Sequence, residues 1–210
     1  GRAMAEAPIG RRVARAIEAV YREFKAPAPT VIEGCPCCIE TRQIDALLGT
    51  PLRDLTGDQL WSYVSGVFYT VGSVHDFRYL LPRILDVAIS DPINGNDPEV
   101  VLRKIGLAEW QGWPEAERTA IVNLVNAWLD HAVERDLAAH RGGDLGWNTD
   151  AVLCGAARAG IALSRYRGML LAPSTASVLA DLRARYPDDL SAYWEDTPQG
   201  LTELAALIGH

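Results

Sequence analysis

Apolar residues recur along most of the chain at spacings of three and four, which place them on one face of an α-helix. The clearest case is 77–89, where the apolar face consists of Phe77, Leu80, Leu81, Ile84, Leu85 and Ala88. This segment predicts a central buried helix that begins near Val74, because Ser73 and Asp76 have the spacing of a capping box. Pro82 lies inside the segment and lacks a backbone N–H, so we expect a kink or a helix in two pieces.

The same spacing predicts further helices on both sides of this segment. They cover 9–25, 39–48, 57–72 after the capping box of Thr56 and Gln59, 98–105 between Asp97 and Gly106, a long segment from Pro114, 148–164, a segment from Pro173, and 198–208. No segment alternates apolar and polar residues as a half-buried strand would. We therefore expect an all-α fold, a single orthogonal bundle of about eight to nine helices. Irregular stacking of helix pairs is the alternative architecture, although no fixed repeat period occurs.

The apolar faces also predict the core and the domain organisation. We expect the core to include Phe77, Leu81, Ile84, Leu85, Trp128 and Leu129. Residues 1–8 are expected to be a tag remnant and a disordered N-terminus, because Gly1 to Ala3 precede Met4. Residues 9–210 then form a single domain, with a weak hinge expected at 140–147, where the sequence HRGGDLGW is rich in glycine.

Composition and charge indicate where the protein is located and which class of partner it binds. Of the 210 residues 49% are apolar, which is enough for a core, and the sequence shows neither a run of 18 apolar residues nor a signal-peptide pattern. We therefore expect a cytoplasmic protein that does not enter membranes. The net charge of −7 repels phosphate backbones, and no stripe of Lys and Arg compensates for it. The charge argues against binding to nucleic acid and favours a protein partner, of which a basic one would complement the acidic charge.

Three of the four cysteines lie within four residues, as Cys35, Cys37 and Cys38. Two thiolates in a C-x-x-C pair can bind one zinc ion, and the missing ligands could come from Cys37, Cys154, His75, His131, His140 or water. A redox pair is the second interpretation, because the helix expected near Ile39 would lower the pKa of Cys38. Buried thiols that act as small apolar side chains are the third. Any bound metal is expected to be zinc held by the three clustered cysteines; otherwise no cofactor is expected.

A second cluster of chemically capable residues lies at the start of the central helix. His75, Asp76, Arg78 and Arg83 could line a pocket with an acid, an imidazole and two guanidinium groups. The structural interpretation is that Asp76 serves as a cap and the arginines form ion pairs with neighbouring helices. Phosphate-binding glycine loops and the common hydrolase and zinc-protease motifs are absent from the sequence.

Three segments together carry a resemblance: EGCPCC at 33–38, PLRDLT at 51–56 and DFRYLLPRIL at 76–85. The chain resembles a group of uncharacterised bacterial hypothetical proteins that pair a CPCC motif with a D-F-R-x-x-L-P-R-I-L helix. The resemblance covers about residues 10–135. It implies a bacterial cytosolic setting and brings no catalytic role with it.

These observations favour a non-enzymatic protein-interaction module. The acidic charge and the helical surface suit a basic protein partner, by analogy with immunity proteins and antitoxins. A zinc-binding or thiol-redox sensor that uses Cys35 to Cys38 is the alternative function, and an enzyme of unrecognised class is the third.

Overall fold

Helix α6 (Glu115–Arg141) is the longest element of the chain, and helices from both halves of the sequence pack along it. The computed structural model describes residues 9–209. Before α6 the helices are α1 (Arg11–Glu23), α2 (Thr41–Gly49), α3 (Gly57–Gly66), α4 (Val74–Ser90) and α5 (Pro98–Leu107). After it follow α7 (Asn148–Arg158), α8 (Arg167–Leu170), α9 (Ala176–Arg185) and α10 (Pro198–Ile208). The expected tag remnant at 1–8 lies outside the described residues.

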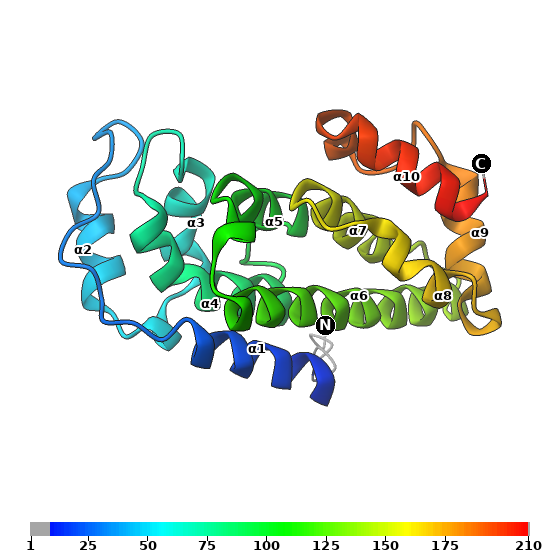
Figure 1. Ribbon diagram of the computed structural model, residues 1–210, viewed down its shortest axis with the longest axis horizontal. Coiled ribbons are helices and arrows are strands. Elements are labelled where there is room, and N and C mark those ends of the chain that lie inside the picture. Colours follow the sequence, from blue (N-terminus) through cyan, green and yellow to red (C-terminus); the bar gives the residue numbers. More distant parts are fainter. Residues whose placement is uncertain (1–8, 210) are drawn as a thin grey trace, which may run out of the picture.

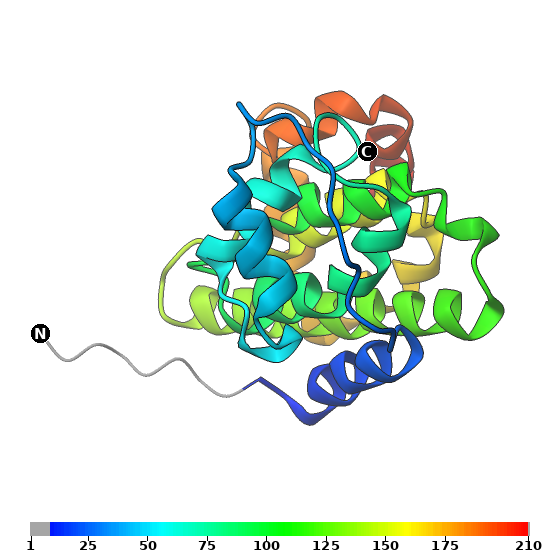
Figure 2. The same cartoon turned by 90° about the vertical axis from the view of Figure 1, so that its left-hand side faces the viewer.

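The helices are arranged in layers around α6. Figures 1 and 2 both place α1 on one side of α6 and α7 on the other, and α5 packs along α7. Helices α2 and α3 form one end of the molecule, whereas α8, α9 and α10 form the opposite end (Figure 1). Residues 9–209 form helices and isolated β-bridges but no β-strand, so the prediction of an all-α fold is confirmed.

The described part of the chain contains ten α-helices, slightly more than the eight or nine expected. The extra element is α8, a single helical turn that follows the 3-10 turn Leu163–Tyr166. Within 9–209 no helix combines the length and the apolarity that crossing a bilayer requires. The six residues predicted for the core are all buried, with exposed fractions of 4% or less.

Helix α4 begins at the predicted capping box. The Ser73 N–H donates to Asp76 Oδ1 at 2.9 Å, and the Tyr63 hydroxyl donates to the other oxygen of the same carboxylate. The helix then continues through Pro82 to Ser90, so the prediction of a helix in two pieces is wrong. Eleven of its residues are buried, and this packing outweighs the loss of one backbone hydrogen bond.

Helix α3 ends at Gly66, six residues before the predicted end at Gly72. The Lys104 ammonium, from α5, donates to the carbonyls of Ser65 and Val67 at 3.3 and 3.0 Å. Beyond this cap the backbone turns and pairs with the cysteine segment, where the Gly72 N–H donates to the Glu33 carbonyl. A neighbouring helix therefore ends α3, and periodicity along the chain could not predict it.

Helix α7 starts at the predicted residue, Asn148, and Trp147 takes the cap position without a capping side-chain hydrogen bond. Asp136 of α6 supplies the missing acceptors: Oδ1 accepts from the Asn148 N–H at 3.1 Å and Oδ2 from the Thr149 N–H at 2.7 Å. The helix ends at Arg158, earlier than the predicted Ser164, and the chain turns at Gly160 with a positive φ of 82°. Asp136 thus connects the end of α6 to the start of α7.

Replacing Gly155 with alanine should destabilise the protein, because α5 and α7 approach closely at this glycine. A Cβ there would lie 2.7 Å from Leu102 Cδ1 and 2.8 Å from the Pro98 carbonyl oxygen. Overpacking of this kind costs about 1–3 kcal/mol, while the better helix propensity of alanine offsets about 1 kcal/mol. Urea unfolding of Gly155→Ala should therefore show a lower midpoint. Gly168→Ala is the control, since its Cβ would meet nothing within 4 Å, and an equal loss there would contradict the explanation.

Candidate functional site

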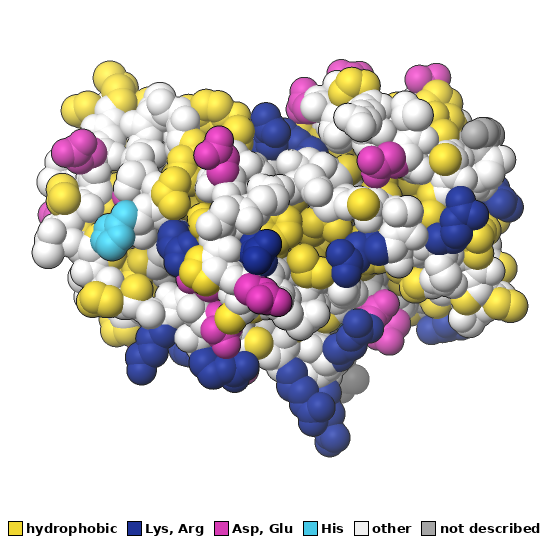
Figure 3. Space-filling model, in the orientation of Figure 1, with side chains coloured by type: hydrophobic (Ala, Val, Ile, Leu, Met, Phe, Trp, Pro, Cys, Tyr) yellow, Lys and Arg dark blue, Asp and Glu magenta, His cyan; other side chains and the backbone are white. Residues whose placement is uncertain are grey.

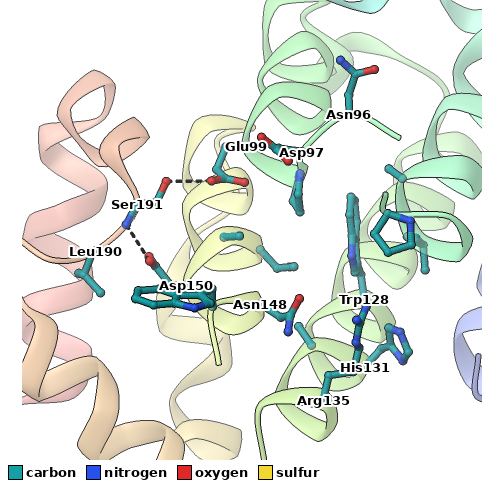
Figure 4. A pocket seen from close by; sticks show the side chains of 18 of the residues that line it. Asn96, Asp97, Glu99, Trp128, His131, Arg135, Asn148, Asp150, Leu190 and Ser191 are labelled. Carbon is teal, nitrogen blue, oxygen red and sulfur yellow. Dashed lines mark hydrogen bonds between the residues drawn. The ribbon is translucent and has the colours of Figure 1, made fainter. Parts of the chain in front are cut away.

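A cavity of about 340 Å³ lies where α4, α5, α6, α7 and the segment 189–191 meet. Glu99 and Asp97 line it from the start of α5, Trp128 and His131 from α6, and Asp150 from α7 (Figure 4). We call it the α5–α7 cavity. Because residues separated by up to 103 positions, Ala88 and Ser191, line one space, only the tertiary structure brings them together.

Glu99 is the buried carboxyl group of the cavity wall. Glu99 is 7% exposed, and its Oε2 accepts a hydrogen bond of 2.8 Å from the Ser191 hydroxyl. Its Oε1 is buried and has no hydrogen-bond partner. Burial raises the pKa of Glu99 above its ordinary value, while hydrogen bonds from its own backbone and from Ser191 oppose the shift and the charges of Asp97 and Asp150 add to it. A proton therefore stays on Glu99 at a pH where an exposed glutamate has lost it.

Asp150 lies beside Glu99 and has all the hydrogen bonds it needs. Its Oδ1 accepts from Trp194 Nε1 at 2.6 Å, and its Oδ2 accepts from the Ser191 N–H at 2.7 Å and from Arg185 at 3.2 Å. Burial raises the pKa of Asp150, and these bonds oppose the shift. Asp150 thus fixes the segment that carries Ser191, and Ser191 in turn bonds to Glu99.

Aromatic and basic side chains complete the walls. Trp128 is 4% exposed, whereas Trp147 is 55% exposed and lies under the Arg185 guanidinium at 4.8 Å. Figure 4 shows Trp128 and His131 on the α6 wall, across the cavity from Ser191 and Asp150. Burial lowers the pKa of His131, and the charge of Arg135 lowers it further. His131 is therefore a neutral imidazole at neutral pH.

Cys154 is buried in α7 near these acids and is separated from the other cysteines. Burial, followed by the charges of Glu99 and Asp150, raises the pKa of its thiol to about 12. A thiol with that pKa is a poor nucleophile and a poor metal ligand at neutral pH. Cys154 therefore acts as a small apolar side chain.

The other three cysteines lie on the segment that pairs with residue 70. The Cys35 N–H donates to the Thr70 carbonyl at 2.8 Å, and the Cys35 carbonyl accepts from the Cys38 N–H at 2.9 Å. All four cysteines are free thiols. Hydrogen bonds from the Cys37 backbone and the Cys38 side chain lower the pKa of Cys35. The thiol with the lowered pKa is thus Cys35, whereas the redox interpretation expected the lowered pKa at Cys38.

Among residues 9–209, no group of three or more His, Cys, Asp or Glu side chains is placed to hold a metal ion. The zinc prediction for Cys35, Cys37 and Cys38 therefore rests on their spacing in the sequence alone.

Three of the four residues of the other predicted pocket contact separate structural partners, and the fourth, His75, is exposed. Arg78 pairs with Glu117 and lies 4.7 Å from the centroid of the Trp113 ring. Arg83 donates to the Leu55 carbonyl at 2.8 Å and pairs with Asp86 at 3.0 Å, Asp76 caps α4, and His75 is exposed. None of His75, Asp76, Arg78 and Arg83 lines the α5–α7 cavity.

Glu99, Asp150 and Ser191 were not predicted from the sequence. Glu99 lies in the first turn of a helix, where an acid is ordinary because it stabilises the positive end. Its partner Ser191 is 92 residues away, in a segment without a motif. No local signal could have paired them.

Comparison of the chain with family models, with curated proteins and with solved structures gives no match. The resemblance to a bacterial family with a CPCC motif therefore remains a prediction.

The thiols should differ in their rate of alkylation. At neutral pH we expect iodoacetamide to modify Cys35 before Cys37, because hydrogen bonds lower the pKa of Cys35 and raise that of Cys37. Cys154 should react only after denaturation, since it is buried and its pKa is about 12. Mass spectrometry with fragmentation of the labelled peptides measures the order. Modification of Cys154 in the folded protein at the rate of Cys35 would contradict these assignments.

Proposed function

We propose that the chain is a non-catalytic binding protein that takes a small ligand in the α5–α7 cavity. The observation that carries the proposal is the Glu99 carboxyl, whose Oε1 is buried at the cavity wall without a partner. Buried polar atoms in folded proteins are almost always hydrogen-bonded, so such an atom marks a place for a missing group. A ligand that donates to Oε1 would complete the site.

The neighbouring groups support binding more than catalysis. Asp150 is occupied by three hydrogen bonds from the protein, and the thiol of Cys154 has a pKa of about 12. Catalysis by a nucleophile needs an activated group beside a base. Fixed polar groups in a partly apolar cavity are instead typical of a recognition site. We also place the protein in a bacterial cytosol, which the free thiols and the resemblance of the CPCC segment support.

Filling part of the cavity should weaken ligand binding. Ala151 lines the cavity from α7, so Ala151→Leu would occupy part of its volume. Fragments that bind the parent protein in ligand-observed NMR should lose about ten-fold or more in affinity for this variant, since they lose contact area. Ala138→Leu, at an exposed position of α6, is the matched control and should retain binding. A fragment screen without any hit that Ala151→Leu weakens would reject the proposal.

A second candidate is the protein-interaction module, and an exposed apolar surface favours it. The end formed by α2, α3 and the segments beside them exposes Val31, Trp61, Tyr69 and Val74, with exposed fractions between 38% and 68%. Residues 31–75 hold five acidic and two basic side chains. Figure 3 shows apolar and acidic side chains exposed together at this end. An apolar surface among acidic groups suits a basic protein partner.

Affinity capture from the host tests this second candidate. At low salt we expect the parent chain to retain a stoichiometric basic protein, and high salt should release it. Trp61→Ser should lose the partner, because it removes the largest exposed apolar side chain of this end. Leu171→Ser, at the opposite end, is the control. Equal capture by the parent and Trp61→Ser would place the partner elsewhere.

A further inference from the structure

We propose that the ligand of the α5–α7 cavity is an organic ammonium ion, an alkylammonium with an apolar or aromatic body, whose N–H groups donate to Glu99 Oε1. This inference rests on the proposed function and names the class of ligand. It depends on three features: the unpartnered oxygen, the acidic surroundings of that oxygen and the aromatic wall.

The unpartnered oxygen requires a donor. Ser191 already donates to Oε2, and Figure 4 shows this bond on one side of the carboxyl group, so Oε1 is the free acceptor. The residue is more than nine-tenths buried and lines the cavity. A bridging water would also donate to it, and a ligand must displace that water with a stronger donor. An ammonium group is such a donor, since hydrogen bonds between charged partners are about twice as strong as neutral ones.

The charges around Glu99 favour a cation. Asp97 precedes it on α5, Asp150 faces it from α7, and Asp189 lines the cavity beside Ser191. The nearby arginines have acidic partners: Arg185 pairs with Asp150 at 3.2 Å and Asp181 at 2.9 Å, and Arg158 pairs with Asp196 at 3.5 Å.

On the α6 wall, burial keeps His131 neutral. Arg135 is exposed to solvent, which screens its charge as it screens the charges of the exposed Asp97 and Asp189, so the buried Asp150 is the least screened acid around Glu99. A carboxylate ligand would instead meet three acids and a buried carboxyl group.

The aromatic wall suits the rest of such a ligand. Trp128 is buried and lines the cavity from α6, and Trp147 lines it from the start of α7. Indole rings attract cations over their faces and apolar groups by burial, which makes them common walls of ammonium sites. At this cavity the protein already uses such a contact, where Arg185 lies over the Trp147 ring.

Binding of an ammonium ion is coupled to the ionisation of Glu99. Burial raises the pKa of the Glu99 carboxyl in the empty cavity, so at a pH below that pKa the carboxyl holds a proton. The ammonium ion binds the ionised form, so binding releases that proton to solvent. Affinity should therefore fall as the pH decreases through the pKa of Glu99, by up to about ten-fold per pH unit below it. His131 also gains positive charge as the pH decreases, and it then repels the ammonium ion. The other charged groups in or near the cavity act on both the protonated and the ionised form of Glu99; these groups are Asp97, Asp150, Asp189, Arg135, Arg158 and Arg185.

Three near-isosteric probes test the class of ligand by calorimetry: 2-phenylethylamine, 2-phenylethanol and 3-phenylpropanoate. At about pH 8, where an alkylammonium remains charged, we expect the amine to bind most tightly. Glu99→Gln should weaken the amine about ten-fold or more and the alcohol by less than about three-fold, since glutamine keeps the shape and an acceptor for Ser191. Glu109→Gln, which removes an exposed charge, should leave all three affinities unchanged.

The outcomes separate the class of ligand from the proposed function. Equal or tighter binding of the alcohol or the carboxylate, lost in Ala151→Leu, overturns the inference and leaves a small-ligand site in the cavity. Amine binding that Glu99→Gln does not weaken also overturns the inference. No binding of any probe, together with a fragment screen without hits, overturns both. Circular dichroism and thermal unfolding of Glu99→Gln confirm that its loss of binding is not a loss of fold. The pH dependence provides a second readout, because only the part carried by His131 should remain in Glu99→Gln.

Discussion

The carboxylate of Asp136 fixes where the second half of the molecule begins. It lies near the end of α6, is 2% exposed, and accepts from the first two backbone N–H groups of α7. The first N–H groups of a helix have no partner within the helix, so a buried helix start needs an outside acceptor. A helix otherwise supplies this cap from its own sequence, as Thr56 does for α3. For α7 the capping acceptor comes from another helix, α6. The start of α7 is therefore stabilised only when α7 packs on α6.

The candidate site depends on that connection. Once α7 is in place, Asp150 binds the Ser191 backbone and the Trp194 ring, which holds the segment after α9 against the cavity. Ser191 then bonds to Glu99 on α5. Three acids on three different helices, Asp136, Asp150 and Glu99, thus position the cavity walls one after another. Two of them, Asp136 and Asp150, use both of their oxygens within the protein, while Glu99 uses one. The contrast between satisfied and unsatisfied buried acids distinguishes structural carboxylates from one available to a ligand.

The two ends of the molecule use cysteine in different ways. At the α2–α3 end, backbone pairing between residues 33–35 and 70–72 places three thiols near the surface. Gly72 is required there, because its φ is 69° and a Cβ would lie 2.4 Å from Asp76 Oδ2. In α7, Cys154 is fully buried beside Glu99 and Asp150. Spacing in the sequence drew attention to the first group, but burial and hydrogen bonding decide which thiol is reactive.

Local patterns in the sequence determined the helices, most of their starts and the core. The apolar face of 77–89, the capping boxes at Thr56 and Ser73, and the helix start at Pro98 act within one or two turns, where the physical causes lie close together in the chain. The early end of α3, the start of α7 and the unbroken α4 were decided by groups from other helices: Lys104, Asp136 and the packing around Pro82. The cavity belongs to this second class. Glu99 is an ordinary first-turn acid by sequence, and it becomes distinct only because folding buries it, brings Ser191 to one oxygen and leaves the other without a partner.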